Sequence, residues 1–200
     1  MEQVTSSLAP PRASAPNKSG PASSSQSGAG SVTKRLGNEL MTLMMSSSPG
    51  ISAFPKTDSN LFDWIGTIEG ASGTVYAGLT FRISIHFPPN YPYVAMAIKF
   101  ETPCYHPNVD INTGSICLDI LQDKWSAVYS VQTILISLQS LLGGAFSPIL
   151  RQDFGELCLI FTEPNNASPL NNDAAAIWDN QEAFKVQLMR YYRPLKDDTA

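Results

Sequence analysis

The chain has 200 residues, of which 43% are hydrophobic and 15% charged, and its formal net charge is −4. This length allows one domain with a sizeable core plus a further segment, and the acidic balance argues against nucleic acid or an anionic membrane as the main partner. The three cysteines contain no CxxC pair, no apolar run reaches membrane-spanning length, and the N-terminus lacks a hydrophobic signal core. We therefore expect a protein of the cytosol and nucleus.

Residues 1–30 are expected to form a disordered tail, because Ser, Ala, Gly and Pro fill 20 of these 30 positions. Such a segment buries too little apolar surface to offset its ordering entropy. A transit peptide is also serine-rich, but Arg12 and Lys18 supply few cations for one. The folded domain is therefore expected to span residues 31–195.

A first helix is predicted from Val32 to about Met45, with Ser31 as its N-cap. Apolar side chains recur at helical spacing, at Val32, Leu36, Leu40 and Leu43. Lys34 and Arg35 would lie in the first turn, where the helix dipole disfavours cations. One interpretation of this pair is a basic face that only contacts solvent.

An antiparallel meander of four strands is predicted after a loop at residues 46–60. The expected strands lie around residues 62–68, 74–76, 79–87 and 97–100. Clean apolar alternation marks the third, at Phe81, Ile83, Ile85 and Phe87. The proline-rich stretch 87–93 predicts a rigid turn without strand pairing.

Helices are expected again toward the C-terminus, at residues 130–142 and from about 181 to 192. Between them, Ser168 and Pro169 lead into an alanine-rich stretch that ends at Trp178. The order of helix, meander and helices indicates an α+β fold.

The chemistry of the chain is concentrated between Thr102 and Trp125. His106-Pro107-Asn108 forms a stiffened turn, because proline fixes its own φ and biases the preceding residue toward an extended conformation. Cys117 follows, within an apolar wall made by Ile116, Leu118, Ile120 and Leu121. A thiol nucleophile beside an amide donor suits acyl transfer, since the Asn108 amide can stabilise the oxyanion formed when an amine attacks a thioester.

These residues resemble the active site of ubiquitin-conjugating enzymes (E2), and the resemblance spans roughly residues 32–194. It rests on His106-Pro107-Asn108, Cys117-Leu118-Asp119-Ile120-Leu121 and Trp125-Ser126. Further stretches resemble the cyclin-selective E2 that serves the anaphase-promoting complex, namely 34–36, 39–45, 50–55 and 102–110.

The resemblance implies the fold of ubiquitin-conjugating enzymes (the UBC fold), a Cys117 thioester with ubiquitin received from an E1, and transfer to lysine with a RING-type E3. His106, Pro107 and Ser168 would border the site, although Ser168 can also be read as a helix cap. E1 and E3 would dock at Lys34, Arg35, Tyr93, Ser126 and Ala127, while Tyr93 can also be read as covering the sheet edge. No metal or other cofactor is expected, because ATP is consumed by the E1, and we expect a monomer.

The family usually has a proline where this chain has Met96, and two further features depart from the family pattern in length. Eight residues separate Asn108 from Cys117, where the family usually has seven, and we expect the turn at residues 112–114 to absorb the extra one.

The second departure is residues 144–162, without which Gly143 would join Glu163 as the family pattern expects. The segment contains nine large or apolar side chains, at Phe146, Ile149, Leu150, Phe154, Leu157, Cys158, Leu159, Ile160 and Phe161. Gly144 can be encoded with GT, residues 157–161 by pyrimidine-rich codons, and Thr162-Glu163 across a CAG acceptor. We interpret the segment as a retained intron or gene-model error, with a genuine regulatory insertion as the alternative.

Three other interpretations are alternatives to the E2 hypothesis. A cysteine hydrolase would pair Cys117 with His106, but no glycine-rich oxyanion turn precedes the cysteine. A zinc site from Cys104, His106 and Cys117 lacks a fourth ligand, and Cys104 is expected to be a small core residue. An inactive splice isoform that acts as an interaction module is the third alternative.

Overall fold

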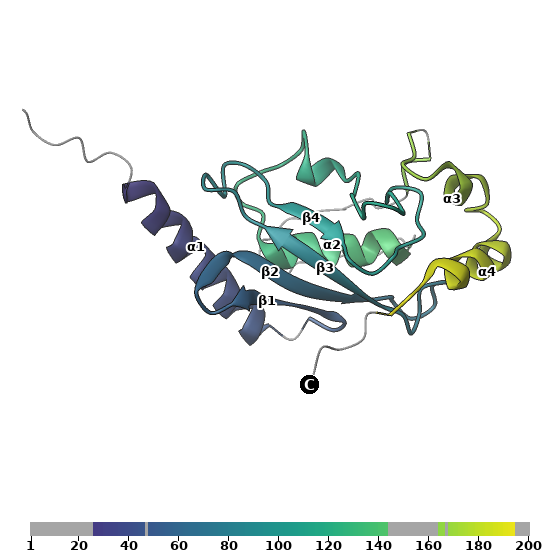
Figure 1. Cartoon of the computed structure of the whole chain (residues 1–200), viewed down its shortest axis with the longest axis horizontal. Coiled ribbons are helices and arrows are strands. Elements are labelled where there is room, and N and C mark those ends of the chain that lie inside the picture. The colour runs from purple at the N-terminus through teal and green to yellow at the C-terminus, as the bar shows by residue number, and fades with distance from the viewer. Residues whose placement is uncertain (1–25, 47, 144–163, 167, 195–200) are drawn as a thin grey trace, which may run out of the picture.

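The computed structural model describes residues 26–46, 48–143, 164–166 and 168–194. In chain order its elements are α1 (Gln26–Met45), β1 (Ile51–Thr57), β2 (Asn60–Glu69), β3 (Thr80–His86), β4 (Ala97–Phe100), the 3₁₀ turn η1 (Asp119–Leu121), α2 (Val131–Gly143), α3 (Asn172–Ala176) and α4 (Gln181–Tyr191). The strands form one antiparallel sheet in the order β1-β2-β3-β4. The predicted α+β architecture with the UBC arrangement is confirmed (Figure 1).

The sheet has one apolar and one polar face, as the alternation in its sequence dictates. Side chains on the inner face are buried, at Trp64, Ile68, Phe81, Ile83, Ile85, Ile98 and Phe100. They form one core with the buried side of α2, at Ile134, Leu135, Leu138, Leu141 and Leu142. In the view of Figure 1, α2 lies behind the sheet and α1 and α4 lie at opposite ends of it.

The first strand differs from the prediction, which was wrong. β1 lies inside the predicted loop 46–60, whereas residues 74–76 form no strand. β1 is an edge strand that contains Pro55, and Ala53 is its only fully buried residue. Its alternation is therefore weak, and pairing with β2 rather than local preference stabilises it.

The start of α1 also differs from the prediction. The helix begins at Gln26, so Ser31 lies inside it and is not its N-cap, and Lys34 and Arg35 are not in its first turn. Extending a formed helix adds a hydrogen bond per residue without a new nucleation step, which offsets the low helix propensity of Gly28 and Gly30. The expected tail thus overlaps α1 at residues 26–30, and its first 25 residues lie outside the described part of the chain.

The predicted insertion at residues 144–162 also lies outside the described residues. The other helices match their predictions closely, at α2 and α4. Within the described part of the chain, no helix combines the length and apolar character needed to cross a membrane.

Candidate active site

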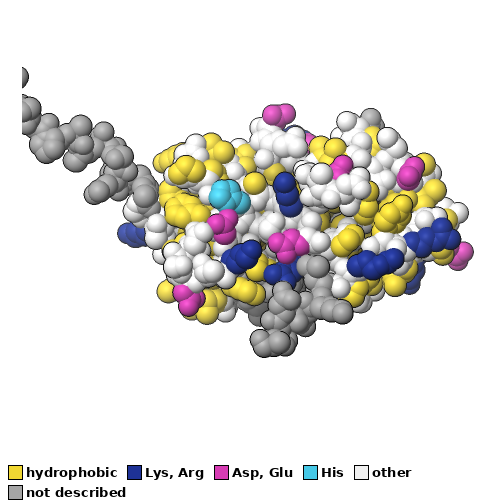
Figure 2. Space-filling model, viewed as in Figure 1, with side chains coloured by type: hydrophobic (Ala, Val, Ile, Leu, Met, Phe, Trp, Pro, Cys, Tyr) yellow, Lys and Arg dark blue, Asp and Glu magenta, His cyan; other side chains and the backbone are white. Residues whose placement is uncertain are grey.

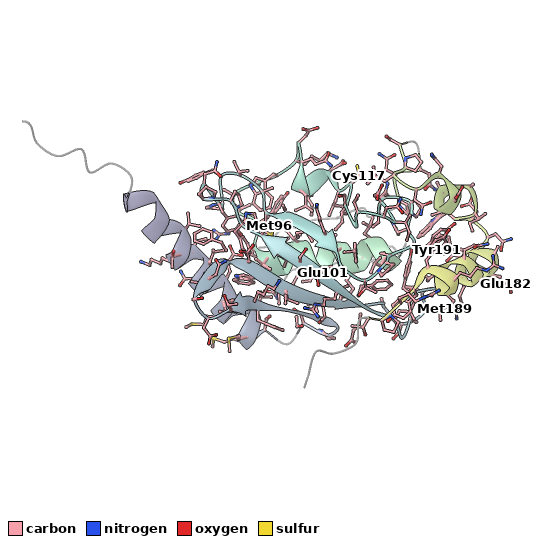
Figure 3. The ribbon with its side chains drawn as sticks, in the orientation of Figure 1. Met96, Glu101, Cys117, Glu182, Met189 and Tyr191 are labelled. Atoms are coloured by element: carbon pink, nitrogen blue, oxygen red, sulfur yellow. The ribbon has the colours of Figure 1, made fainter. Side chains whose placement is uncertain are left out.

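The segment that leads to Cys117 runs along the outer edge of β4. Ser115 forms an antiparallel bridge with Lys99, and the N–H of Phe100 donates a 2.9 Å hydrogen bond to the carbonyl oxygen of Gly114. Gly114 has a φ of +68°, and a Cβ there would lie 2.0 Å from the Phe100 carbonyl oxygen, so glycine is required. Pairing with β4 fixes the backbone just before the cysteine, and Figure 3 shows Cys117 on this side of the sheet.

Residues 109–116 form a closed hairpin, which accommodates the extra residue between Asn108 and Cys117. At its base, the N–H of Cys117 donates a 2.9 Å hydrogen bond to the carbonyl oxygen of Asn108. At its turn, the Asp110 carboxylate accepts hydrogen bonds from the N–H and hydroxyl of Thr113, at 2.7 and 2.9 Å. These bonds lower the pKa of Asp110. The turn therefore holds the added length, and the backbone of Cys117 stays directly beside Asn108.

The two described cysteines differ in accessibility. Cys117 is half-buried, and Nε2 of Gln122 lies 3.9 Å from its Sγ. Cys104 is 1% exposed, and burial raises the pKa of its thiol well above the ordinary value. A thiolate is the reactive form of cysteine, so Cys104 is unsuited to nucleophilic attack. Cys158 lies outside the described residues.

His106 is a structural residue at the base of this site. Its Nδ1 accepts a 3.0 Å hydrogen bond from the N–H of Asn108, which leaves the proton on Nε2 to donate to the carbonyl oxygen of Leu141 at 3.2 Å. Burial lowers the pKa of the imidazole to about 3. Both ring nitrogens are thus engaged and the ring stays neutral, which argues against a base for a Cys117 hydrolase.

A zinc site at these residues has equally little support. The engaged ring of His106 has no free nitrogen to offer a metal ion. Among the described residues, no three His, Cys, Asp or Glu side chains converge in a way that could hold one.

Asn108 joins the cysteine hairpin to the chain at residue 165. Its Oδ1 accepts a 2.8 Å hydrogen bond from the N–H of Asn165, and its Nδ2 donates a 3.1 Å bond to the carbonyl oxygen of the same residue. Asn108 is 1% exposed. The amide therefore braces a loop in the resting state, a contact that the sequence analysis did not predict.

Pro107 anchors the other end of that loop. Its carbonyl oxygen accepts hydrogen bonds from the N–H groups of Leu170 and Asn171, at 2.8 and 3.0 Å. Asn171 is the N-cap of α3, because its side chain accepts a hydrogen bond from the N–H of Ala174. The interpretation of Ser168 as a helix cap is therefore wrong. Ser168 itself is exposed on this loop. An Asn three residues before Ala174 was a signal for this cap.

Comparison with known proteins agrees with this geometry. The profile of the family described as ubiquitin-conjugating enzyme matches residues 35–149, more than half of the chain. The chain is also 55% identical over 168 residues to a protein of Schizosaccharomyces pombe named ubiquitin-conjugating enzyme E2-20 kDa, and the match covers 84% of each chain.

The chain belongs to the ubiquitin-conjugating enzyme (E2) family. It is therefore an enzyme of ubiquitin conjugation, and membership implies ubiquitin, an E1 and an E3 as partners.

In this E2, the two loops that the resemblance assigns to E3 contact lie side by side. Nε1 of Trp125 donates a 2.8 Å hydrogen bond to the carbonyl oxygen of Pro92. Tyr93 is 83% exposed, which excludes the reading in which it covers the sheet edge. Ser126 and Ala127 are half-buried, and the exposed apolar side chain of the second loop is Val128 instead.

The two cations of α1 have different surroundings. Lys34 is exposed, whereas Arg35 is half-buried. Arg35 forms an ion pair with Glu39, and its Nη2 donates a 2.9 Å hydrogen bond to the carbonyl oxygen of Tyr129. Arg35 therefore does not belong to a basic face that only contacts solvent.

Glu39 is a buried acid that the sequence analysis overlooked. Its carboxylate accepts hydrogen bonds from the hydroxyl of Tyr91 and the N–H of Val131, both at 2.7 Å. Its burial could have been predicted from its position three residues after Leu36, which places it on the apolar side of the helix.

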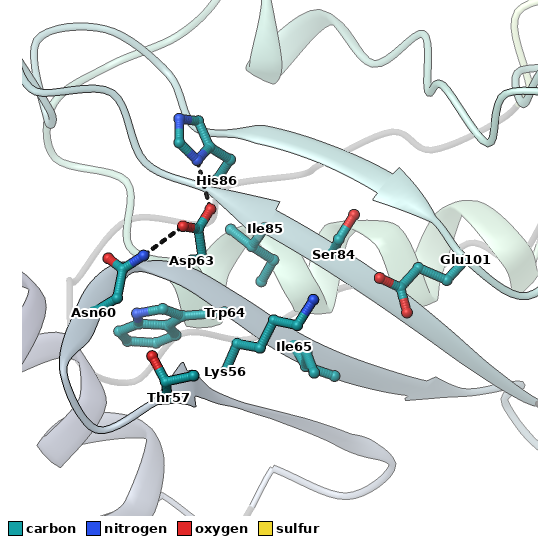
Figure 4. A pocket seen from close by; sticks show the side chains of 10 residues that line it. All are labelled: Lys56, Thr57, Asn60, Asp63, Trp64, Ile65, Ser84, Ile85, His86 and Glu101. Carbon is teal, nitrogen blue, oxygen red and sulfur yellow. Dashed lines mark hydrogen bonds and ion pairs between the residues drawn. The ribbon is translucent and has the colours of Figure 1, made fainter. Parts of the chain in front are cut away.

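The outer face of the sheet carries a separate polar hollow of about 300 Å³ (Figure 4). Asp63 accepts hydrogen bonds there from Asn60 and pairs with His86, both at 2.6 Å. The bond with His86 is the main reason that the pKa of Asp63 is lowered. Figure 2 shows basic and acidic side chains mixed over this face. The hollow is not lined by Cys117, so it belongs to no step at the cysteine.

Proposed function

We propose that Cys117 carries ubiquitin as a thioester. The observation that supports this most strongly is its accessible thiol next to the His-Pro-Asn turn, while Cys104 is buried with a raised pKa. The Cys117 thiolate attacks the thioester carbonyl of an E1-ubiquitin conjugate, a new carbon–sulfur bond forms, and the old carbon–sulfur bond breaks so that the E1 thiolate departs. Because the incoming thioester is already activated by ATP at the E1, no base beside Cys117 is required.

The second step is transfer to a lysine. The neutral amine attacks the carbonyl carbon of the Cys117 thioester and a tetrahedral oxyanion forms. The attacking nitrogen then loses a proton to water, and the carbon–sulfur bond breaks so that the Cys117 thiolate departs as the amide forms. Asn108 supports this step in two ways: its carbonyl oxygen accepts from the Cys117 N–H, and its side chain holds the backbone of Asn165. We infer that the Nδ2 hydrogen not used by Asn165 donates to the oxyanion. The neighbouring Ser168 loop borders the path of the incoming lysine.

The partner in this transfer is inferred to be a RING-type E3, with the anaphase-promoting complex as the specific candidate and cell-cycle proteins as substrates. The inference is supported by stretches 34–36, 39–45, 50–55 and 102–110, which resemble the cyclin-selective E2. Exposed Tyr93 and Val128 on adjacent loops supply the apolar contact that such a partner needs. Lys34 would add a charged contact at the edge.

For the chain as a whole, we propose a catalytic domain at residues 31–195 that follows a tail and is interrupted by residues 144–162. The described chain on the two sides of that segment is fixed independently, through Leu141 to His106 and through Asn165 to Asn108. A retained intron or a gene-model error is our explanation of its origin. Comparing genomic DNA with transcripts across codons 143–163 tests it, and spliced transcripts without codons 144–162 are expected.

The function is tested by incubating the full chain with an E1, ATP and labelled ubiquitin, followed by a non-reducing gel. A ubiquitin adduct that disappears on addition of thiol reductant is expected. Addition of free lysine and a RING domain should then discharge the adduct. A full chain that folds yet never charges would instead support the inactive splice isoform.

A further inference from the structure

The carboxylate of Glu39 joins three segments that are far apart in the sequence. It forms an ion pair with Arg35 on its own helix. It also accepts hydrogen bonds from the Tyr91 hydroxyl, in the loop at residues 87–93 (the first partner loop), and from the N–H of Val131, where α2 begins. The Glu39 side chain is only 7% exposed. No other carboxylate in the described part of the chain is this deeply buried.

The residues around Glu39 extend this junction to both partner loops. Arg35 donates from Nη2 to the carbonyl oxygen of Tyr129, next to exposed Val128. Tyr91 lies two residues before exposed Tyr93, and its ring packs 6.1 Å from that of Trp125. The cluster Glu39, Arg35 and Tyr91 thus ties α1 to the chain beside each of the two exposed apolar side chains.

General stability is a poor explanation for a buried carboxylate. Removing a charge from water costs free energy that its hydrogen bonds only partly return, so apolar side chains of similar volume would pack as well. What the carboxylate adds is a fixed geometry, since it accepts hydrogen bonds from donors on three segments at once. Burial, and then the negative charge of Glu39, raise the pKa of Tyr91 well above its ordinary value, so the hydroxyl remains a donor at any pH at which the protein works.

We propose that Glu39 is a positioning residue for stimulated transfer: it holds α1 and the loops at residues 87–93 and 124–130 as one preassembled docking surface for a RING-type partner. It takes no part in the bonds made and broken at Cys117. The proposal rests on the proposed RING partnership.

The test compares Glu39→Gln and Tyr91→Phe with the wild type. Glu39→Gln keeps the shape but replaces an acceptor oxygen by a donor, and Tyr91→Phe removes one hydroxyl while retaining the ring. Glu101→Gln is the matched control, because it removes a carboxylate that pairs with Arg82 at 2.9 Å on the sheet. Each variant is first charged by the E1. Its discharge to free lysine is then measured at increasing concentrations of a purified RING domain that stimulates the wild type.

We expect the half-stimulating RING concentration to rise about tenfold in Glu39→Gln and in Tyr91→Phe, the effect of one buried hydrogen bond lost. Unstimulated discharge should not change, and Glu101→Gln should match the wild type throughout. A half-stimulating concentration equal to that of the wild type in both variants overturns the proposal. So does a parallel loss of stimulated and unstimulated rates, which would indicate a general structural role.

If no RING domain stimulates the wild type, the proposed partnership fails while the role of Glu39 can still be judged. Amide hydrogen exchange in Glu39→Gln should then be faster in both loops and unchanged in β2 and β3. Equal exchange in the loops of the wild type and the variant would overturn the positioning role by itself.

Discussion

Replacing Asn108 by alanine separates the two steps of the proposed reaction. The change removes two hydrogen bonds to the backbone of Asn165, at 2.8 and 3.1 Å, from a side chain that is 1% exposed. We expect the free energy of unfolding to fall by about 1–3 kcal/mol. Charging at Cys117 should persist, because the thiol and its path to the E1 are unchanged, while discharge to free lysine slows roughly a hundredfold, the usual effect of losing one oxyanion donor.

The assay is single-turnover discharge of purified, charged protein, with thermal unfolding measured in parallel. Asn108→Asp serves as the matched variant, since it keeps an acceptor for the Asn165 N–H but loses the donor. If Asn108 donates to the oxyanion, Asn108→Asp discharges no faster than Asn108→Ala. Discharge of Asn108→Ala at the wild-type rate would refute the reasoning and leave Asn108 as a loop brace alone.

Two further predictions concern His106 and the segment 144–162. The free energy of unfolding should fall as the pH drops below about 6.5, by at most about 1.4 kcal/mol per pH unit from His106, because the unfolded chain binds a proton that the buried ring excludes until about pH 3. Urea unfolding at several pH values measures this, and an NMR titration of the native His106 ring near its ordinary pKa would contradict it. The deletion of residues 144–162 should fold, charge at Cys117 and remain monomeric in size-exclusion chromatography, whereas the full chain should be less soluble, since its nine large or apolar side chains favour burial against another molecule. A deletion that unfolds or loses charging, beside an active and well-behaved full chain, would make the segment an integral part of the domain.

Local patterns in the sequence predicted the parts of the fold that depend on local physics. α2 and α4 have helical apolar spacing, and β3 has strict alternation, so all three were found close to their observed bounds. β1 was missed because Pro55 and a single fully buried residue leave no pattern without β2 beside it. The start of α1 was missed because the cap signal at Ser31 was weaker than continued helix growth.

The site was predicted in its residue types but not in its contacts. The His-Pro-Asn turn and Cys117 could be read directly, because their chemistry depends on identity and short spacing. The bonds from Asn108 to Asn165 and from Val131 to Glu39 join residues 57 and 92 positions apart. Such contacts depend on tertiary packing, which a single sequence does not encode in any local pattern.

The most direct test of the central claim is to locate ubiquitin on the protein after charging by the E1. Intact and peptide mass spectrometry of Cys117→Ser should find one ubiquitin in an oxyester at residue 117 that survives thiol reductant. Cys117→Ala should carry none, and Cys104→Ala and Cys158→Ala should charge like the wild type. Normal charging of Cys117→Ala, with loss of charging in Cys104→Ala or Cys158→Ala, would contradict the assignment.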